Sequence, residues 1–122
     1  MRPKILLIDD DPAVHEFMRI KLGQRFAVTG ITDPGGAVEV IRREKPDVIL
    51  CDIEMPGMDG GDVSAQLFAD ETLRDIPLLF LTGLASPADL TNTKGQLGGR
   101  PALSKSAPVE QLIEKIEALL QR

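Results

Sequence analysis

Two clusters of aspartates, each at the end of an apolar run, are the residues of this chain best suited to chemistry. The apolar residues 5–8 lead into three aspartates at 9–11, and the apolar residues 48–51 lead into Asp52. Short apolar runs bounded by polar residues predict buried strands of a parallel sheet. Carboxylates just past the carboxyl ends of two such strands would meet in the crevice where open α/β sheets bind ligands.

Carboxylates gathered in one crevice repel one another, so they need a bound cation or must lose charge by protonation. Mg²⁺ prefers hard oxygen ligands and is commonly held by one or two carboxylates together with a phosphate. The two clusters therefore predict a magnesium site that serves phosphoryl chemistry.

The apolar pattern predicts repeated units, each a strand followed by a helix. The expected strands are residues 4–8, 26–32, 48–51, 76–81 and 101–104. Asp-Pro pairs at 11–12 and 33–34 are typical of helix starts, and the proline- and glycine-rich residues 54–61 predict a loop before the third helix. The last helix is expected over residues 108–120.

Residue spacing also predicts which side of each helix faces the sheet. Phe17 is expected on the buried face of the first helix, and Phe68 on that of the third. The fourth helix should begin at the capping box of residues 86–89 and stay short, because weak helix formers follow. Its main apolar anchors would be Leu90 and Leu97.

The strand order follows from burial. Strands one, three and four are almost wholly apolar, as central strands covered by helices on both faces should be. Strand two is interrupted by Thr29 and Gly30, and the short strand five carries Pro101, so both are expected at edges. The prediction is a flavodoxin-like (βα)5 doubly wound α/β fold with a five-stranded parallel sheet in the order 2-1-3-4-5. Its switch point lies between the two strands that carry the acidic clusters.

Length and composition indicate one globular domain over residues 1–122. The net charge of -5 argues against a nucleic-acid-binding face. No segment is apolar for long enough to cross a bilayer, and we expect no membrane association. The single cysteine, Cys51, is interpreted as a small buried hydrophobe, and the lack of a disulfide favours a cytoplasmic protein. His15, the only histidine, is expected at the surface.

The chain resembles a response regulator receiver domain over its whole length. The matching residues are the pair Asp9 and Asp10, then Asp52, the Met-Pro-Gly-Met-Asp-Gly run at 55–60, Thr82 and Lys105. One acidic pair would be weak evidence, since aspartates often cap helices. The set is specific because its members follow the predicted strands one, three, four and five in the order of the family.

The resemblance implies a magnesium site with defined ligands. Asp10 and Asp52 would bind Mg²⁺ directly, together with the backbone carbonyl of Glu54. Asp9 would act through water or by orienting the other carboxylates. Mg²⁺ would neutralise both the attacking carboxylate and the incoming phosphoryl group.

The resemblance also assigns the covalent step. Asp52 would be the phosphoacceptor and would form an acyl phosphate. Lys105 would pair with Asp52 before phosphorylation and with phosphoryl oxygens afterwards. The Thr82 hydroxyl would donate a hydrogen bond to the phosphoryl group, and its inward movement would signal outward.

A receiver takes its phosphate from a sensor histidine kinase or a histidine-phosphotransfer protein, and these are the implied partners. Phosphorylation would switch a protein-interaction surface formed by the fourth helix, fifth strand and fifth helix. The family uses this face for output and dimerisation, so a homodimer through it is one expected assembly. The chain would be a signalling domain that catalyses only its own aspartyl phosphorylation and dephosphorylation. No effector domain is expected in residues 1–122, and the downstream effector protein is not identified.

Two residues depart from the family pattern. Ser106 follows Lys105, where the family usually has proline, and Ala102 stands where an aromatic residue is usual. These departures leave open a degenerate receiver, a constitutive protein-interaction module with little phosphorylation-coupled output. A Mg²⁺-dependent phosphatase acting on external substrates shares the acidic chemistry, but a chain of 122 residues with short loops has no room for a substrate-covering cap.

Overall fold

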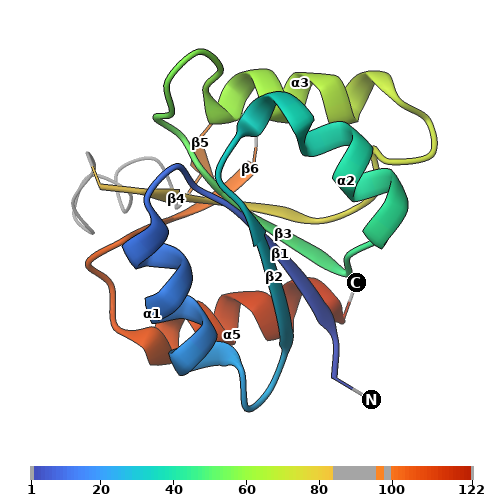
Figure 1. Cartoon of the computed structure of the whole chain (residues 1–122). Helices are drawn as coiled ribbons and strands as arrows, with labels where there is room; N and C mark the ends of the chain where they lie inside the picture. Colours follow the sequence, from blue (N-terminus) through green and yellow to red (C-terminus); the bar gives the residue numbers. More distant parts are fainter. Residues whose placement is uncertain (1, 84–95, 98–99, 122) are drawn as a thin grey trace.

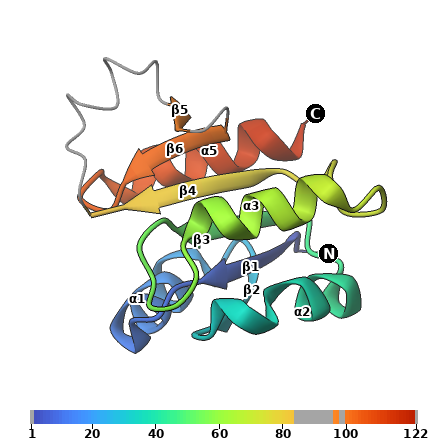
Figure 2. The same cartoon turned by 90° about the horizontal axis from the view of Figure 1, so that it is seen from above.

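The computed structural model describes residues 2–83, 96–97 and 100–121, which form a sheet between two layers of helices (Figure 1). Helices α1 and α5 cover one face of the sheet, and α2 and α3 cover the other (Figures 1 and 2). The fourth helix predicted from residue 86 lies outside the described residues. Within the described part of the chain, no helix combines the length and the apolar composition that crossing a membrane requires.

The strands are those that the apolar runs predict, with one addition. They are β1 (Lys4–Ile8), β2 (Ala27–Ile31), β3 (Val48–Asp52), β4 (Leu78–Thr82), β5 (Gln96–Leu97) and β6 (Arg100–Ser104). Their order in the sheet is β2-β1-β3-β4-β6-β5. All neighbours pair in parallel except β5, which runs antiparallel to β6. The predicted flavodoxin-like order 2-1-3-4-5 is therefore confirmed, with β6 as the fifth parallel strand.

The Asp-Pro pair at 11–12 opens a helix as predicted, whereas the pair at 33–34 opens a 3₁₀ turn and the second helix starts three residues later, at Ala37. They are α1 (Pro12–Leu22), α2 (Ala37–Glu44), α3 (Gly60–Ala69) and α5 (Val109–Leu120), and a 3₁₀ turn, η1 (Pro34–Gly36), precedes α2. Asp11 caps α1 by accepting from the Ala13 N–H at 2.9 Å. Asp59 and Asp62 form a reciprocal capping box at the start of α3.

The central strands separate two apolar cores. Side chains of β1, β3 and β4 alternate between the faces, so Leu6 and Ile49 meet α2 and α3, whereas Leu7 and Leu50 meet α1 and α5. All five residues of β3 are buried. Burial on both faces fixes the register of these strands, and with it the position of the residue that follows each of them.

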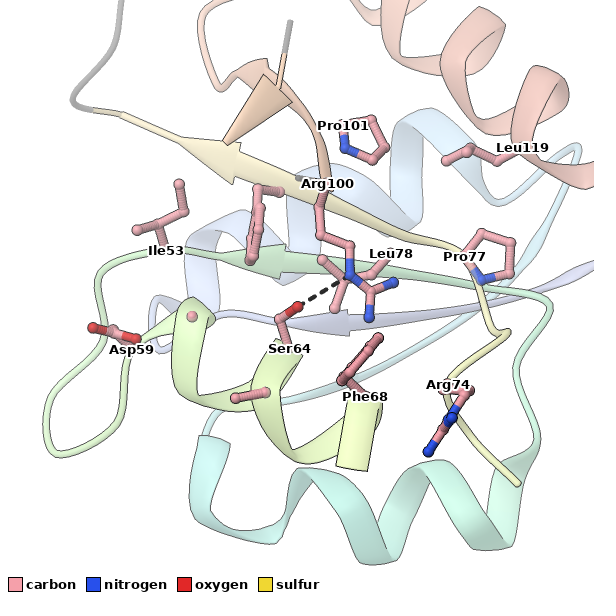
Figure 3. Close-up of a pocket in the computed structure, with 13 residues that line it drawn as sticks. Ile53, Asp59, Ser64, Phe68, Arg74, Pro77, Leu78, Arg100, Pro101 and Leu119 are labelled. Carbon is pink, nitrogen blue, oxygen red and sulfur yellow. Dashed lines mark hydrogen bonds between the residues drawn. The ribbon is translucent and has the colours of Figure 1, made fainter. Parts of the chain in front are cut away.

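Four predictions from the apolar pattern are wrong: the burial of two phenylalanines, the helical assignment of Leu97 and the edge position of the fifth strand. Phe17 is 46% exposed and Phe68 is 67% exposed. The Arg74 guanidinium lies over the Phe68 ring, 5.4 Å from its centroid. Both residues line a cavity of about 770 Å³ between α3 and β6, where the Arg100 Nε–H donates to Ser64 Oγ at 3.0 Å (Figure 3). Leu97, expected in a helix, belongs to strand β5, so β6 is not an edge.

The two helices on one face are joined by a carboxylate at the end of α3. Asp70 accepts from the Thr72 hydroxyl at 2.7 Å and from the Thr72 N–H at 2.9 Å. Arg42 of α2 donates to the other oxygen of Asp70 at 2.7 Å. The hydrogen bonds from Thr72, followed by the one from Arg42, lower the pKa of Asp70 from 3.8 to about 2.

We expect Asp70→Asn to lower the melting temperature at pH 7, with an effect that shrinks below pH 3.8 and disappears below about pH 2. The lowered pKa means that the ionised carboxylate stabilises the folded state at any pH above 3.8. This stabilisation is lost as the pH falls through about 2, where the folded state also takes up the proton. Thermal melts of both proteins across this range test the expectation. Asp75→Asn, which changes an exposed carboxylate of the same loop, is the control, and an equal shift in that variant would contradict it.

Candidate functional site

The acidic residues of the two predicted clusters meet at the carboxyl ends of adjacent strands. Ile8 of β1 pairs with Cys51 of β3, so Asp9 and Asp52 follow two partnered residues. One oxygen from each of Asp9, Asp10 and Asp52 can be chosen so that all three lie within 4.8 Å of one another. Asp9 and Asp52 are buried, whereas Asp10 is exposed.

Lys105 supplies the positive charge on the other side of this cluster. Its Nζ lies 2.8 Å from Oδ2 of Asp9 and 3.4 Å from Oδ2 of Asp52. The expected contact with Asp52 is present, but the lysine is closer to Asp9, which sequence reasoning had not paired with it. Asp9 is fully buried and the Lys105 side chain is 26% exposed, so water screens this ion pair only weakly.

Hydrogen bonds from the backbone and from two serine hydroxyls fix the chain on both sides of Lys105. Ser104, the last residue of β6, pairs with Thr82 of β4, and the Lys105 N–H donates to the Thr82 carbonyl at 2.8 Å. The Ser106 N–H donates to Ser104 Oγ at 3.2 Å, and the two serine hydroxyls lie 2.8 Å apart. The peptide bond to Ser106 is trans, as are the others in the described segments. Lys105 therefore reaches the carboxylates without the usual proline.

Thr82 also lies at the carboxyl ends of the parallel strands. It ends β4 one residue beyond Leu81, the partner of Asp52 in β3, and it is 3% exposed. The predicted phosphoryl-binding residues thus come from the ends of three successive strands, β3, β4 and β6. Glu54 is exposed, and its backbone N–H hydrogen-bonds the Asp52 carboxylate.

Two neighbours of the site were not predicted to matter. His15 was expected at the surface, but it is half-buried, and its Nε2 contacts the Asp9 carbonyl at 2.7 Å. Gly60 begins α3 against the backbone at the end of β3, where an added Cβ would lie 2.6 Å from the Asp52 carbonyl oxygen. The Gly60 N–H also donates to the Ile53 carbonyl at 2.7 Å. A side chain at residue 60 would push the helix away from the site.

Burial and neighbouring charges shift three pKa values here. Burial raises the pKa of Asp52; Lys105 opposes that shift, and the Asp9 charge adds to it. Burial alone would lower the pKa of Lys105, but the two carboxylates outweigh it, so the lysine pKa is raised and its charge secured. Burial, with the Asp52 charge, raises the pKa of the Cys51 thiol to about 12. Cys51 is a buried hydrophobe, as predicted, and not a reactive thiolate.

The donor set fits a hard divalent cation. The three aspartates offer only oxygen atoms, and Asp10 is exposed to solvent, so an ion could enter and keep some water ligands. Among the described residues, the Lys105 ammonium pairs with two of these three carboxylates, Asp9 and Asp52, which leaves negative charge that a cation would balance. These residues could hold Mg²⁺.

Comparison with known proteins gives a family model and curated relatives. The model described as the response regulator receiver domain matches residues 5–117. The DNA-binding dual master transcriptional regulator RpaA of Synechocystis is 36% identical over 98% of this chain and 50% of its own length. The DNA-binding response regulator MtrA of Mycolicibacterium smegmatis is 32% identical over 100% of this chain and 52% of its own length. The chain thus spans about half the length of these curated relatives.

Solved structures share the fold over nearly the whole chain. The BeF3-activated N-terminal receiver domain of Klebsiella pneumoniae RstA has a TM-score of 0.81 and 29% identity, covering 98% of this chain and 99% of that domain. The signal receiver domain of a Syntrophus aciditrophicus signal transduction histidine kinase has a TM-score of 0.82 and 27% identity, covering 98% of this chain and 90% of that domain.

Proposed function

The chain belongs to the response regulator receiver domain family, and we propose that it accepts a phosphoryl group on Asp52 in a Mg²⁺-dependent two-component phosphorelay. The observation that carries the proposal is the meeting of three carboxylates with one lysine at a single sheet edge. One carboxylate oxygen from each of Asp9, Asp10 and Asp52 lies within 4.8 Å of the other two, and Lys105 contacts two of these residues.

In the proposed reaction, a carboxylate oxygen of Asp52 attacks the phosphorus of the donor. The new bond is an acyl phosphate, and the bond from phosphorus to the donor's leaving group breaks. Lys105 is charged and already beside Asp52, so it can move to the phosphoryl oxygens without leaving Asp9. The buried Thr82 hydroxyl would donate a hydrogen bond to the same group.

The residues proposed to hold the metal are Asp10, Asp52 and the backbone carbonyl of Glu54, with Asp9 acting through water or by orienting the others. When bound, Mg²⁺ would neutralise charge on the attacking carboxylate and the phosphoryl oxygens. Asp9 suits a supporting role because one of its oxygens accepts from the Asp11 N–H and the other faces Lys105. Asp10 is the exposed member of the cluster.

We expect Asp10→Ala to weaken Mg²⁺ binding by well over about tenfold, since loss of even an outer-shell partner costs about 10–100-fold. The measurement is a calorimetric or fluorescence Mg²⁺ titration of the two proteins. Asp33→Ala is the control, because Asp33 is an exposed cap of a different helix start and should leave the affinity unchanged. An unaltered titration of Asp10→Ala would remove Asp10 from the ligand set.

The proposed partners are a sensor histidine kinase or histidine-phosphotransfer protein upstream and an effector protein downstream. Residues 1–122 would act as one receiver domain with no effector domain among them and with no enzymatic activity beyond its own phosphorylation and dephosphorylation. The output surface would comprise the segment around residue 86, β6 and α5, and a homodimer through this face is one form of output. DNA binding is named for the relatives and is not proposed for this domain.

One observation favours a second candidate, a degenerate receiver with little phosphorylation-coupled output. Ala102 of β6 pairs with Phe80 and is 1% exposed, so the family's aromatic position holds a small core residue. An alanine cannot swing between outward and inward positions as a large ring can. In this alternative the domain binds its effector whether or not Asp52 is phosphorylated.

Incubation with acetyl phosphate and Mg²⁺, followed by intact mass measurement, tests the proposal. A gain of one phosphoryl group that requires Mg²⁺ is the expected result, and no gain would overturn it. Amide hydrogen exchange with and without the phosphoryl group then separates the two candidates. A competent switch changes the exchange of β6 and α5, whereas a degenerate receiver changes only the residues around Asp52.

A further inference from the structure

His15 lies near the start of α1 and contacts the main chain of Asp9, a residue of the acidic site. Its Nε2 is 2.7 Å from the backbone carbonyl oxygen of Asp9, and a carbonyl oxygen can only accept. Nε2 therefore carries the hydrogen and donates it. This hydrogen bond links His15 of α1 to Asp9, the first residue of the turn between β1 and α1.

The imidazole fits this position only because residue 30 has no side chain. Gly30 is on β2, opposite Leu7 of β1. A Cβ at Gly30 would overlap His15 Nδ1 and lie 2.5 Å from Cε1, far inside contact distance. Gly57 is the one glycine with a positive φ in the described ranges, so space, not backbone conformation, requires glycine at residue 30.

The bond from His15 completes the fixation of the Asp9 main chain. The Asp9 N–H donates to the Ile31 carbonyl at 3.2 Å, and Asp9 Oδ1 accepts from the Asp11 N–H at 2.9 Å. The carbonyl of Asp9 belongs to the same peptide unit as the N–H of Asp10. Fixing that plane therefore sets the backbone from which the Asp10 carboxylate projects.

We propose that His15 is a positioning residue of the acidic site, acting on Asp9 and Asp10 through the Asp9 carbonyl, and that Gly30 is the residue that admits it. The inference rests on the proposed function, because it assigns His15 to the same magnesium and phosphoryl site. Outer partners that orient ligating groups change metal affinity about 10–100-fold when removed.

A ring above a strand glycine also adds packing, and packing alone would affect stability without affecting the metal site. The two nitrogens of the ring allow the roles to be separated. The amide N–H of glutamine extends to about the position of Nε2, whereas that of asparagine lies near Nδ1. His15→Gln should therefore keep the donor to Asp9, and His15→Asn should lose it.

The first experiment is a Mg²⁺ titration of the full chain without a phosphodonor. We expect His15→Gln to bind Mg²⁺ as the wild type does, and His15→Ala and His15→Asn to bind about tenfold more weakly. Unchanged affinity in the last two variants would overturn the inference. Equal weakening in all three, glutamine included, would also overturn it, since packing and not the hydrogen bond would then be responsible.

The second experiment uses Gly30. Gly30→Ala should displace the ring and weaken Mg²⁺ binding about as much as His15→Ala does. In the His15→Ala background, Gly30→Ala should have no further effect, because no ring is left to displace. Gly36→Ala is the matched control, since an added Cβ there meets nothing within 4 Å. Additive losses from the two changes would contradict the inference.

A third measurement needs no metal. Amide hydrogen exchange at Asp10 and Asp11 in metal-free protein should be faster in His15→Ala and His15→Asn than in wild type and His15→Gln, by more than the exchange of the core amides of β3 changes. Failure of the proposed function has a different signature: wild-type protein would neither bind Mg²⁺ nor accept a phosphoryl group. Wild-type protein that does both, with all His15 variants unaltered, would overturn the inference about His15 alone.

Discussion

Asp52→Asn is expected to abolish the phosphoryl mass gain that the wild type shows with acetyl phosphate and Mg²⁺. The amide oxygen of asparagine carries no charge and is a far weaker nucleophile than a carboxylate, so the loss should be complete. Asp52 is the last residue of β3, and its carboxylate contacts the Lys105 ammonium and accepts a hydrogen bond from the Glu54 N–H. The measurement is the intact mass of both proteins after equal incubation.

Asp11→Asn is the matched control for this experiment. Asp11 is exposed, adjoins the acidic cluster and caps α1, and asparagine caps helices about as well as aspartate. The control therefore removes the same charge from the same region while keeping the fold, and it should gain phosphoryl mass like the wild type. A gain that persists in Asp52→Asn would identify another residue as the acceptor.

Lys105→Ala is expected to lower the free energy of unfolding by about 3 kcal/mol without Mg²⁺, the low end of the cost of breaking a buried ion pair. The low end applies because the Lys105 side chain is 26% exposed, although its partner Asp9 is fully buried. Removing the ammonium leaves the Asp9 and Asp52 carboxylates facing each other without a counter-charge. Chemical denaturation of the wild type and the variant measures the difference.

Saturating Mg²⁺ should recover a large part of this loss, because a divalent cation supplies the missing positive charge and binds only the folded state. Mg²⁺ should therefore stabilise the variant more than it stabilises the wild type. Lys115→Ala is the control: Lys115 is an exposed residue of α5, and alanine is a good helix former. Equal stability of Lys105→Ala and wild type without Mg²⁺ would contradict the proposed role of the ion pair.

The sheet could be predicted from the sequence because each central strand is a compact apolar run. A strand that is buried on both faces is a continuous apolar run in the sequence. The residue that follows the run must then lie at the carboxyl end of that strand. The positions of Asp9, Asp52 and Thr82 follow from this rule alone. Lys105 follows from it as well, since it comes directly after the last parallel strand, β6.

The errors arise where local pattern does not decide burial. Helical spacing allows Phe17 and Met18 to share an apolar sector, but α1 turns only Met18 fully inward. Phe68 has the same ambiguity with Leu67, which is fully buried. Leu97 was assigned to a helix because nothing in a two-residue strand distinguishes it from the end of a weak helix.

Contacts that depend on the third dimension could not be predicted. No sequence pattern shows that the Lys105 ammonium lies closer to Asp9 than to Asp52, since both aspartates follow central strands. The bond from His15 to Asp9 depends on space above Gly30, which lies in a different strand. The one available signal was Gly30 itself, because glycine within a strand often marks a close approach.

Helices α1 and α5 share one face of the sheet, and this pairing has a consequence for biosynthesis. A ribosome makes the acidic turn after β1 first, whereas Lys105 and α5 come near the end of residues 1–122. At about 5–20 residues per second, several seconds separate the two events. During that interval the apolar face of α1 has no neighbouring helix and Asp9 has no ammonium partner. The nascent first half therefore cannot complete its core or neutralise its carboxylates, and the whole domain should fold in one step once α5 has emerged.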